Sequence, residues 1–322
     1  MAARQAAGNS LAGRIRGFRA GLRMGRRRMR GLARDRVPGE SGHAMSRRAL
    51  IIGCGFTAQR TARTLLQAGW DVTATSRSPE KLAALEVSGA RLVRFDAARD
   101  RRIEAAAEGA SVLLSVPTLK LDGELFEPTP GLVSALRGRP RHLTYLSTTG
   151  VYGATRNVDE RTPVSPQTER QQLRAGAEEV VRSHGCSALV LRPAAIYGPG
   201  RGVHQAMREG RFRLPRDSSR QVSRIHVDDL AAIVARALQQ RVEGAYPVAD
   251  ECPAASADVA RYCATLLDLP APELVAEDCL SETRRADRRV DGSAIRRLLG
   301  VRLRYPSFRD GIPACIAAEE AG

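Results

Sequence analysis

The 322-residue sequence lacks the features that mark membrane, secreted and metal-binding proteins. It has no apolar run of the roughly 20 residues that a helix needs to cross a bilayer, and no apolar signal-peptide core near its start. The six cysteines include no Cys-x-x-Cys pair and the five histidines no His-x-x-x-His pair, so we expect no metal site. We therefore expect a protein of the reduced cytoplasm with no membrane partner.

Lysine is almost absent from the chain. Lys81 and Lys120 are the only two, so arginine supplies nearly all of the formal charge of +16. Residues 1–45 contain eleven arginines against Asp35 and Glu40, which gives this segment +9 of the total. The remaining excess is spread along the chain, which indicates a compositional bias rather than a local patch. We expect no specific nucleic-acid partner.

The basic segment 1–45 has three interpretations. We favour a disordered extension or an over-long start, because Met45 would open a globular domain directly before its first strand. An arginine-rich targeting presequence is the second interpretation, and a basic arm for nucleic acid or a membrane surface is the third.

An apolar run that begins at Ala49 ends in a Gly-x-Gly-x-x-Ala turn, which indicates a bound dinucleotide. Gly53 supplies the tight turn, Gly55 lets the backbone approach a pyrophosphate, and Ala58 lets helix and strand pack closely. The phosphates would lie at the N-terminus of the following helix, where unpaired N–H groups point outward. The residues expected to contact the cofactor here are Gly53, Gly55, Phe56 and Thr57.

The next elements complete a β-α-β unit. Apolar spacing predicts a helix over about 57–67 and a second strand over 70–75. Where an NAD site would place an acidic residue, this strand is followed by Arg77, which can meet a 2′-phosphate. We therefore predict NADP as the cofactor, with NAD as the alternative if Arg77 is only one more solvated arginine.

Strands and helices continue to alternate through the next 50 residues. Further strands are expected over 91–96 and 111–116, with helices over 103–108 and 132–136 between and after them. This is the pattern of a doubly wound α/β (Rossmann) fold with a parallel sheet. Because such sheets bind ligands at the carboxyl ends of their strands, three more cofactor contacts are expected, with helix capping as the alternative for the first. They are Asp96, Val116 and Pro117.

Three later motifs give the sequence a family resemblance. Residues 145–153 (Tyr-Leu-Ser-Thr-Thr-Gly-Val-Tyr-Gly), 191–200 (Leu-Arg-Pro-Ala-Ala-Ile-Tyr-Gly-Pro-Gly) and 225–230 (Ile-His-Val-Asp-Asp-Leu) follow the glycine turn in order. Together they resemble the extended short-chain dehydrogenase/reductases, the NAD(P)-dependent epimerase/dehydratase group. The resemblance implies a Rossmann domain over 46–197, and a smaller substrate lobe over 198–322 from which 225–248 returns to the core. It also places Pro193 at the cofactor.

The catalytic signature of this family is altered here. The resemblance implies a Ser or Thr that holds the substrate oxygen, a Tyr that exchanges a proton, and a Lys four residues later that lowers the Tyr pKa. Arg170 stands at the Tyr position and Arg174 at the Lys position. Arginine does not titrate usefully, so Arg170 cannot replace the Tyr, whereas Arg174 can still bind the cofactor ribose or phosphate as a cation.

Other residues would then carry the chemistry. Thr148 aligns with the family's substrate-binding hydroxyl, although a Thr that caps a turn is the alternative. Tyr152, Tyr197 and His226 are the titratable residues in the matched motifs, and we select Thr148 and Tyr152 as the catalytic candidates. Both arginines could also form a solvated stripe on a helix over 169–182.

The expected function is NADP-dependent oxidoreduction or epimerisation of a small substrate. Six arginines of the lobe would suit an anionic substrate, although the compositional bias toward arginine explains them equally well. They are Arg201, Arg211, Arg213, Arg216, Arg220 and Arg224. The alternative function is a non-catalytic NADP-binding sensor or scaffold, and a homodimer is left open.

Overall fold

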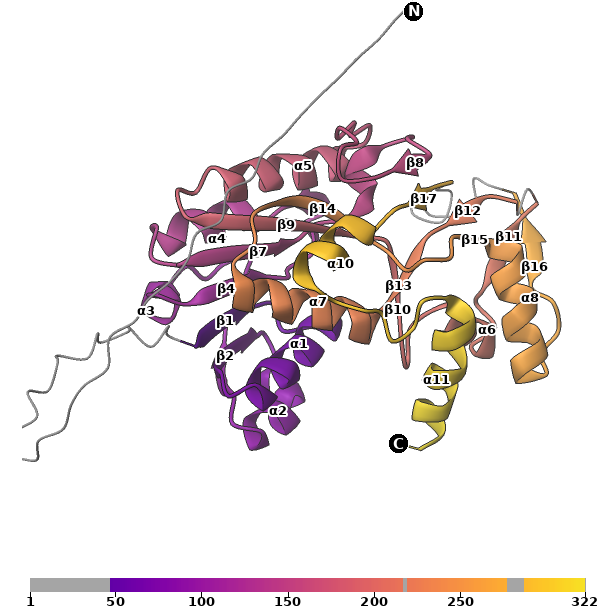
Figure 1. The fold of residues 1–322 in the computed structure, drawn as a ribbon, viewed down its shortest axis with the longest axis horizontal. Helices are drawn as coiled ribbons and strands as arrows, with labels where there is room; N and C mark the ends of the chain where they lie inside the picture. The colour runs from indigo at the N-terminus through magenta and orange to yellow at the C-terminus, as the bar shows by residue number, and fades with distance from the viewer. Residues whose placement is uncertain (1–46, 217–218, 277–286, 322) are drawn as a thin grey trace, which may run out of the picture. The chain divides into compact units, whose positions relative to one another are not determined.

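The computed structural model describes residues 47–216, 219–276 and 287–321, so the basic segment 1–45 lies outside the described residues. Residues 45–322 form one compact unit, whose centre is a seven-stranded parallel sheet in the order β14-β9-β7-β4-β1-β2-β3 (Figure 1). Its strands are β1 (Arg48–Ile52), β2 (Asp71–Ser76), β3 (Arg91–Arg94), β4 (Ser111–Leu114), β7 (His142–Leu146), β9 (Ser187–Pro193) and β14 (Gly244–Val248). The predicted doubly wound α/β fold is therefore confirmed.

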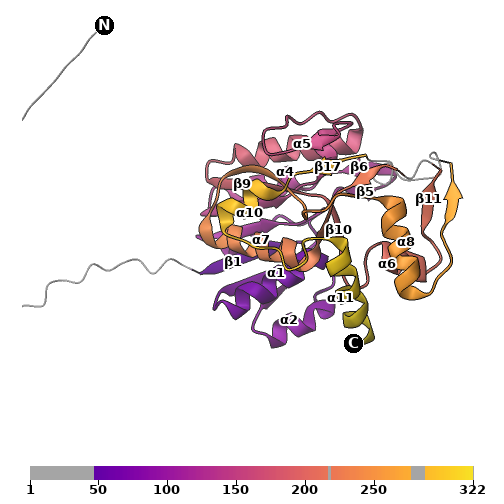
Figure 2. The same cartoon turned by 45° about the vertical axis from the view of Figure 1, so that its right-hand side comes forward.

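Helices cover both faces of the sheet (Figures 1 and 2). Alternate strand residues point to opposite faces, so Ile51 packs in one apolar cluster while Leu50 and Ile52 pack in the other. The Ile51 face is covered by α1 (Phe56–Gln67), α2 (Ala83–Val87), α7 (Val227–Gln240) and α10 (Ser293–Leu299). The Leu50 face is covered by α3 (Glu104–Ala107), α4 (Thr129–Leu136) and α5 (Glu169–Arg182).

A smaller lobe lies beyond the carboxyl ends of the strands, to the right in Figure 1. Its helices α6 (Val203–Arg208), α8 (Ser256–Leu267) and α11 (Phe308–Glu320) share a third apolar cluster. The short strands, most of them in or beside this lobe, pair as follows: β8 (Asn157–Val158) with β17 (Arg289–Val290), β10 (Ala195–Tyr197) with β13 (Arg224–His226), β11 (Arg213–Pro215) with β16 (Glu273–Val275), β12 (Gln221–Val222) with β15 (Ala254–Ala255), and β5 (Leu119–Leu121) with β6 (Glu124–Phe126). Two 3₁₀ turns, η1 (Pro79–Leu82) and η2 (Thr149–Tyr152), complete the described elements.

In the described part of the chain, no helix is long and apolar enough to span a membrane. Within the same ranges, no cluster of three or more His, Cys, Asp or Glu side chains is placed to hold a metal ion.

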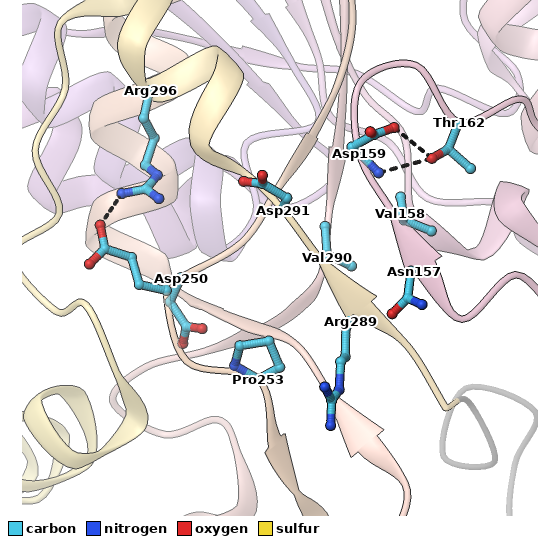
Figure 3. Close-up of a pocket in the computed structure, with 11 residues that line it drawn as sticks. Asn157, Val158, Asp159, Thr162, Asp250, Pro253, Arg289, Val290, Asp291 and Arg296 are labelled. Atoms are coloured by element: carbon cyan, nitrogen blue, oxygen red, sulfur yellow. Dashed lines mark hydrogen bonds and ion pairs between the residues drawn. The ribbon is translucent and has the colours of Figure 1, made fainter.

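A cavity of about 520 Å³ lies where β8 and β17 meet the segment after β14 (Figure 3). Eight of its eleven lining residues are polar or charged, and they include an ion pair between Arg296 and Glu251 and a hydrogen bond from Thr162 to Asp159. Asp250 Oδ2 is buried there with no hydrogen-bond partner among the described residues, and burial raises the pKa of Asp250 to about 7. None of the residues expected at the cofactor lines this cavity.

Candidate cofactor and substrate site

The glycine turn has two glycines with different surroundings. Gly53 has a φ of +87°, and a Cβ there would lie 2.8 Å from Val116 Cγ2 and 3.0 Å from the carbonyl oxygen of Ser115. Only glycine fits this position, because both the backbone angle and the space exclude a side chain. A Cβ on Gly55 would meet nothing within 4 Å, so the backbone there borders open space.

The N-terminus of α1 follows this open backbone. Gly55 is the N-cap, no side chain caps the first turn, and no acidic residue lies in it. The first N–H groups of α1 therefore keep their positive end available for an anion. Thr57 is buried and Phe56 half-buried in this turn, and Ala58 is fully buried against the sheet.

The residues expected on the adenosine side lie at the ends of β2 and β3. The Arg77 side chain is exposed, and its carbonyl oxygen accepts a hydrogen bond of 2.7 Å from Arg94. Asp96 Oδ1 accepts a hydrogen bond of 3.0 Å from the backbone N–H of Ala98, so this carboxylate caps a turn. The next helix, α3, begins only at Glu104, so Asp96 is not the helix cap that was its alternative role.

The segments after β4 and β9 supply the other expected contacts. Val116 is buried against Gly53, and Pro117 is exposed beside it. Pro193 is the buried last residue of β9 and pairs with Val248 of β14.

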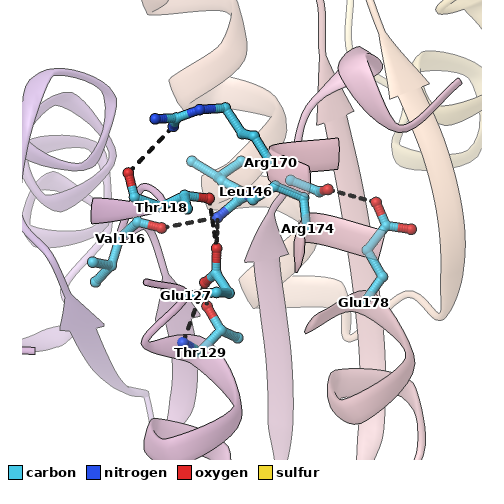
Figure 4. Close-up of polar contacts among 9 residues, drawn as sticks. Val116, Thr118, Glu127, Thr129, Leu146, Arg170, Arg174 and Glu178 are labelled. Carbon is cyan, nitrogen blue, oxygen red and sulfur yellow. Dashed lines mark hydrogen bonds and ion pairs between the residues drawn. The ribbon is translucent and has the colours of Figure 1, made fainter. Parts of the chain in front are cut away.

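Arg174 is buried in an ion pair, with 7% of its side chain exposed (Figure 4). Its Nη1 donates to Glu127 Oε2 at 3.2 Å and to the carbonyl oxygen of Val116 at 3.1 Å, while Nη2 donates to the carbonyl oxygen of Leu146. The guanidinium also lies 4.6 Å from the Tyr145 ring. Arg174 thus ties the ends of β4 and β7 together, which corrects the expectation of a cation held free for the cofactor.

Glu127 follows the β5–β6 hairpin and neutralises Arg174. Besides Arg174, its carboxylate accepts hydrogen bonds from Thr118 Oγ1 at 2.8 Å and from both the hydroxyl and the N–H of Thr129. Sequence reasoning missed Glu127, because nothing in its local pattern distinguishes it from a surface carboxylate. The one sequence feature that could have pointed to Glu127 is Arg174, 47 residues away, which stands at the position of the family's lysine.

Arg170 has the opposite environment. Its side chain is exposed, and Nη1 donates a hydrogen bond of 3.3 Å to the carbonyl oxygen of Thr118 (Figure 4). A solvated guanidinium therefore stands at the position that the family resemblance gives to a Tyr.

Thr148 ends the strand segment as the cap of η2. Its hydroxyl accepts a hydrogen bond of 3.1 Å from the N–H of Gly150, and it is half-buried. A Cβ on Gly150 would lie 3.4 Å from the Thr148 side chain and 4.0 Å from Gln171 Cγ, so Thr148 lies near the first turn of α5, which also carries Arg170. Among the described residues, no Tyr or His side chain is hydrogen-bonded to Thr148, and the family's usual proton relay is not assembled.

Tyr152 is fully buried, contrary to the accessible position that a proton-transfer group needs. Its hydroxyl accepts a hydrogen bond of 2.9 Å from Arg192, which forms a buried ion pair with Glu178. Burial raises the pKa of Tyr152 above its ordinary value, and Glu178 also accepts a bond from Ser147. The structure favours a structural role for Tyr152.

The other two titratable candidates are also enclosed. Tyr197 is buried, and burial raises its pKa. His226 caps α7 through a hydrogen bond from the N–H of Asp228, its other ring nitrogen lies 3.4 Å from Cys315 Sγ, and burial lowers its pKa to about 4. Neither side chain is presented to a substrate.

Arg288 of the lobe is a further residue that the sequence did not single out. It is 8% exposed, and its guanidinium donates to the carbonyl oxygens of Thr149, Gly153 and Thr155. The lobe is thereby fastened to the segment that carries Thr148.

Comparison with known proteins gives matches over most of the chain. Residues 53–241 match the family model described as NAD(P)H-binding. Protein YeeZ of Escherichia coli K12 is 26% identical over 275 residues, which covers 81% of this chain and 97% of YeeZ.

Two solved structures are similar over their whole lengths. A functionally unknown conserved protein from Silicibacter pomeroyi is 32% identical, with a TM-score of 0.72, over 84% of this chain and 99% of that one. A proposed NAD-dependent epimerase/dehydratase from Methylobacillus flagellatus is 27% identical, with a TM-score of 0.68, over 86% of this chain and 100% of that one. The chain therefore belongs to the NAD(P)H-binding family, among the extended short-chain dehydrogenase/reductases of the epimerase/dehydratase type.

Proposed function

We propose that the protein is an NAD(P)-dependent oxidoreductase or epimerase that prefers NADP and acts on a small anionic substrate. The observation that carries the cofactor part is the pairing of open backbone at Gly55 with an uncapped N-terminus of α1. Together they offer unpaired N–H groups and space to a pyrophosphate. Support for NADP comes from exposed Arg77 after β2, where a guanidinium can meet a 2′-phosphate.

The cofactor part is tested by Gly55→Ala. The added Cβ meets no protein atom, and the φ of −93° is open to alanine, so the fold should tolerate the change. The same Cβ would enter the space proposed for the pyrophosphate, and we expect the dissociation constant for NADPH to rise at least tenfold by calorimetry. Gly176→Ala is the matched control, because Gly176 is an exposed residue of α5 with equally free surroundings.

Equal affinity of Gly55→Ala and the parent protein for NADPH would reject this site. Titration of the parent with NADH and NADPH tests the choice of cofactor, and equal or tighter binding of NADH would reject the preference for NADP.

The substrate part rests on Arg170 and Thr148. NADPH, when bound, supplies a hydride, and the protein then needs groups that hold the substrate oxygen. In this proposal the Arg170 guanidinium, from the first turn of α5, and the Thr148 hydroxyl, near that turn, both donate hydrogen bonds to a negatively charged oxygen. Because arginine keeps its proton, the proton for the product would come from water rather than from position 170.

A screen of carbonyl compounds, each with and without a carboxylate, tests this part through the loss of NADPH absorbance. We expect turnover of carboxylated compounds only, and loss of that turnover in Thr148→Ala. Turnover unaffected by Thr148→Ala would reject the assignment of the site.

The alternative function is a non-catalytic NADP-binding sensor or scaffold. It is favoured by the burial of Arg174 in an ion pair and by the enclosure of Tyr152. Tight NADPH binding without turnover in the screen would support it.

We also propose a reduced cytoplasmic setting for the protein. The five described cysteines, which are all free thiols, are compatible with it. Homodimer formation is left open.

A further inference from the structure

The loop 198–202 of the Tyr-Gly-Pro-Gly motif lies directly on the first residue of α1. A Cβ on Gly198 would come within 2.4 Å of Val227 Cγ1 and 3.1 Å of Phe56 Cζ. The backbone of this loop therefore touches the residue that follows Gly55 in the glycine turn. Any side chain on the loop that turns toward Phe56 lies close to the N-terminus of α1.

The loop is held in a fixed shape. Gly198 and Arg201 exchange two backbone hydrogen bonds, of 2.8 Å and 2.9 Å. Glu319 of α11 accepts a hydrogen bond of 2.6 Å from the N–H of Gly200 and lies 3.0 Å from His204 Nε2. Arg201 thus projects from an anchored backbone, and less conformational entropy is lost when it binds a ligand.

The Arg201 side chain reaches Phe56 without an anionic partner. Its guanidinium carbon lies 5.3 Å from the centre of the Phe56 ring, and the described residues give this guanidinium no ion pair or hydrogen bond. Arg60, which lies 4.4 Å from the same ring, is instead paired with Asp228 at 2.9 Å. Two cations flank one ring, and only Arg60 is neutralised.

An anion at the N-terminus of α1 would neutralise Arg201. The first turn of α1 contains no acidic side chain, and its N–H groups and Arg201 carry charge of the same sign. The Arg201 residue is exposed, so its guanidinium is accessible to a ligand from solvent. An anionic ligand beside Phe56 would relieve this arrangement.

We propose that Arg201 binds the pyrophosphate of the dinucleotide, so that the substrate lobe and the Rossmann domain hold the cofactor jointly. This inference rests on the proposed function, since it assumes a cofactor at the glycine turn. Arg201 would approach the phosphates from the lobe, beside the Phe56 ring.

The test compares two ligands that share the adenosine 2′-phosphate and differ in the pyrophosphate. 2′-Phospho-ADP-ribose contains the pyrophosphate, and 2′-AMP does not. We expect Arg201→Met to weaken binding of 2′-phospho-ADP-ribose about 10- to 100-fold, the range for one charged hydrogen-bonding group. Binding of 2′-AMP should change less than twofold, and Arg201→Lys should recover part of the loss.

Arg261→Met is the matched control, because Arg261 is an exposed lobe arginine of α8 with a surface ion pair. It should leave both dissociation constants unchanged. Parental affinity of Arg201→Met for 2′-phospho-ADP-ribose would overturn the inference, as would an equal loss for both ligands. Absence of all binding in the parent protein would reject the proposed function itself.

Discussion

At the scale of single residues, two arginines four positions apart in α5 have different roles. Both donate to carbonyl oxygens after β4, Arg170 to Thr118 and Arg174 to Val116, so they share a helix face. The solvated stripe that was the alternative for this pair is wrong for Arg174. Only Arg174 is buried, because Glu127 supplies the opposite charge. Arg174 therefore braces the ends of β4 and β7, whereas the exposed Arg170 is the cation to which the proposed function gives a binding role.

We expect Glu127→Ala to lower the free energy of unfolding by about 3–5 kcal/mol, because it leaves Arg174 charged and buried without a partner. Urea denaturation followed by circular dichroism measures the change. The double variant Glu127→Met/Arg174→Met should lose much less, since no unpaired charge remains.

The matched control for this prediction is Glu108→Ala, which removes the exposed ion pair with Arg139 and should change stability by less than about 1 kcal/mol. Equal losses in the Glu108 and Glu127 variants would show that the buried pair does not stabilise the strand ends.

At the scale of elements, periodicity predicted the central sheet well and the lobe poorly. The helix expected over 57–67 is α1, and the strand expected over 70–75 is β2 shifted by one residue. Helix α7 begins at Val227, inside the motif at 225–230, because His226 caps it with a side-chain acceptor. The β5–β6 hairpin escaped prediction, since two three-residue strands carry too short a pattern.

The candidate site was predicted only where it is local in sequence. Gly53 and Gly55 could be recognised from one turn, because their roles depend on their own backbone. Glu127 and Arg288 could not be recognised in this way. Glu127 lies 47 residues from Arg174, and Arg288 lies about 135 residues from the carbonyl groups to which it donates. Such pairs are set by the packing of whole elements, which spacing rules do not contain.

The attachment of β17 to η2 gives an element-scale prediction. Arg288→Met removes the donors to three carbonyl oxygens in the segment 149–155. We expect amide hydrogen exchange across this segment to accelerate at least tenfold, with no change in β1. The control is Arg289→Met, which changes the exposed arginine next to Arg288 in the sequence. Unchanged exchange in the Arg288 variant would mean that the lobe does not hold this segment.

At the scale of the whole molecule, buried titratable groups give opposing pH dependences. His142 and His226 have pKa values lowered to about 4 by burial, against an ordinary 6.5. The unfolded chain then binds more protons between these values, so their contribution to stability is lost as the pH falls from about 6.5 to 4. Asp250 acts in the other direction, because burial raises its pKa from 3.8 to about 7 and the folded chain binds more protons in that range.

The Asp250 contribution can be isolated with Asp250→Asn. The sign follows from the raised pKa: stability due to the protonated carboxyl is complete below about pH 3.8 and is lost as the pH rises to about 7. Asp250→Asn does not undergo this loss. Its free energy of unfolding minus that of the parent should therefore increase from pH 4 to pH 8, by no more than about 4 kcal/mol, since one unit of pKa shift corresponds to about 1.4 kcal/mol. Asp291→Asn, in the same cavity, should show no such increase over this range, because hydrogen bonds from Ser293 lower the pKa of Asp291 below its ordinary 3.8 and its contribution changes only at lower pH. Parallel pH profiles of the two variants in urea denaturation would show that the buried Asp250 oxygen carries no penalty when ionised.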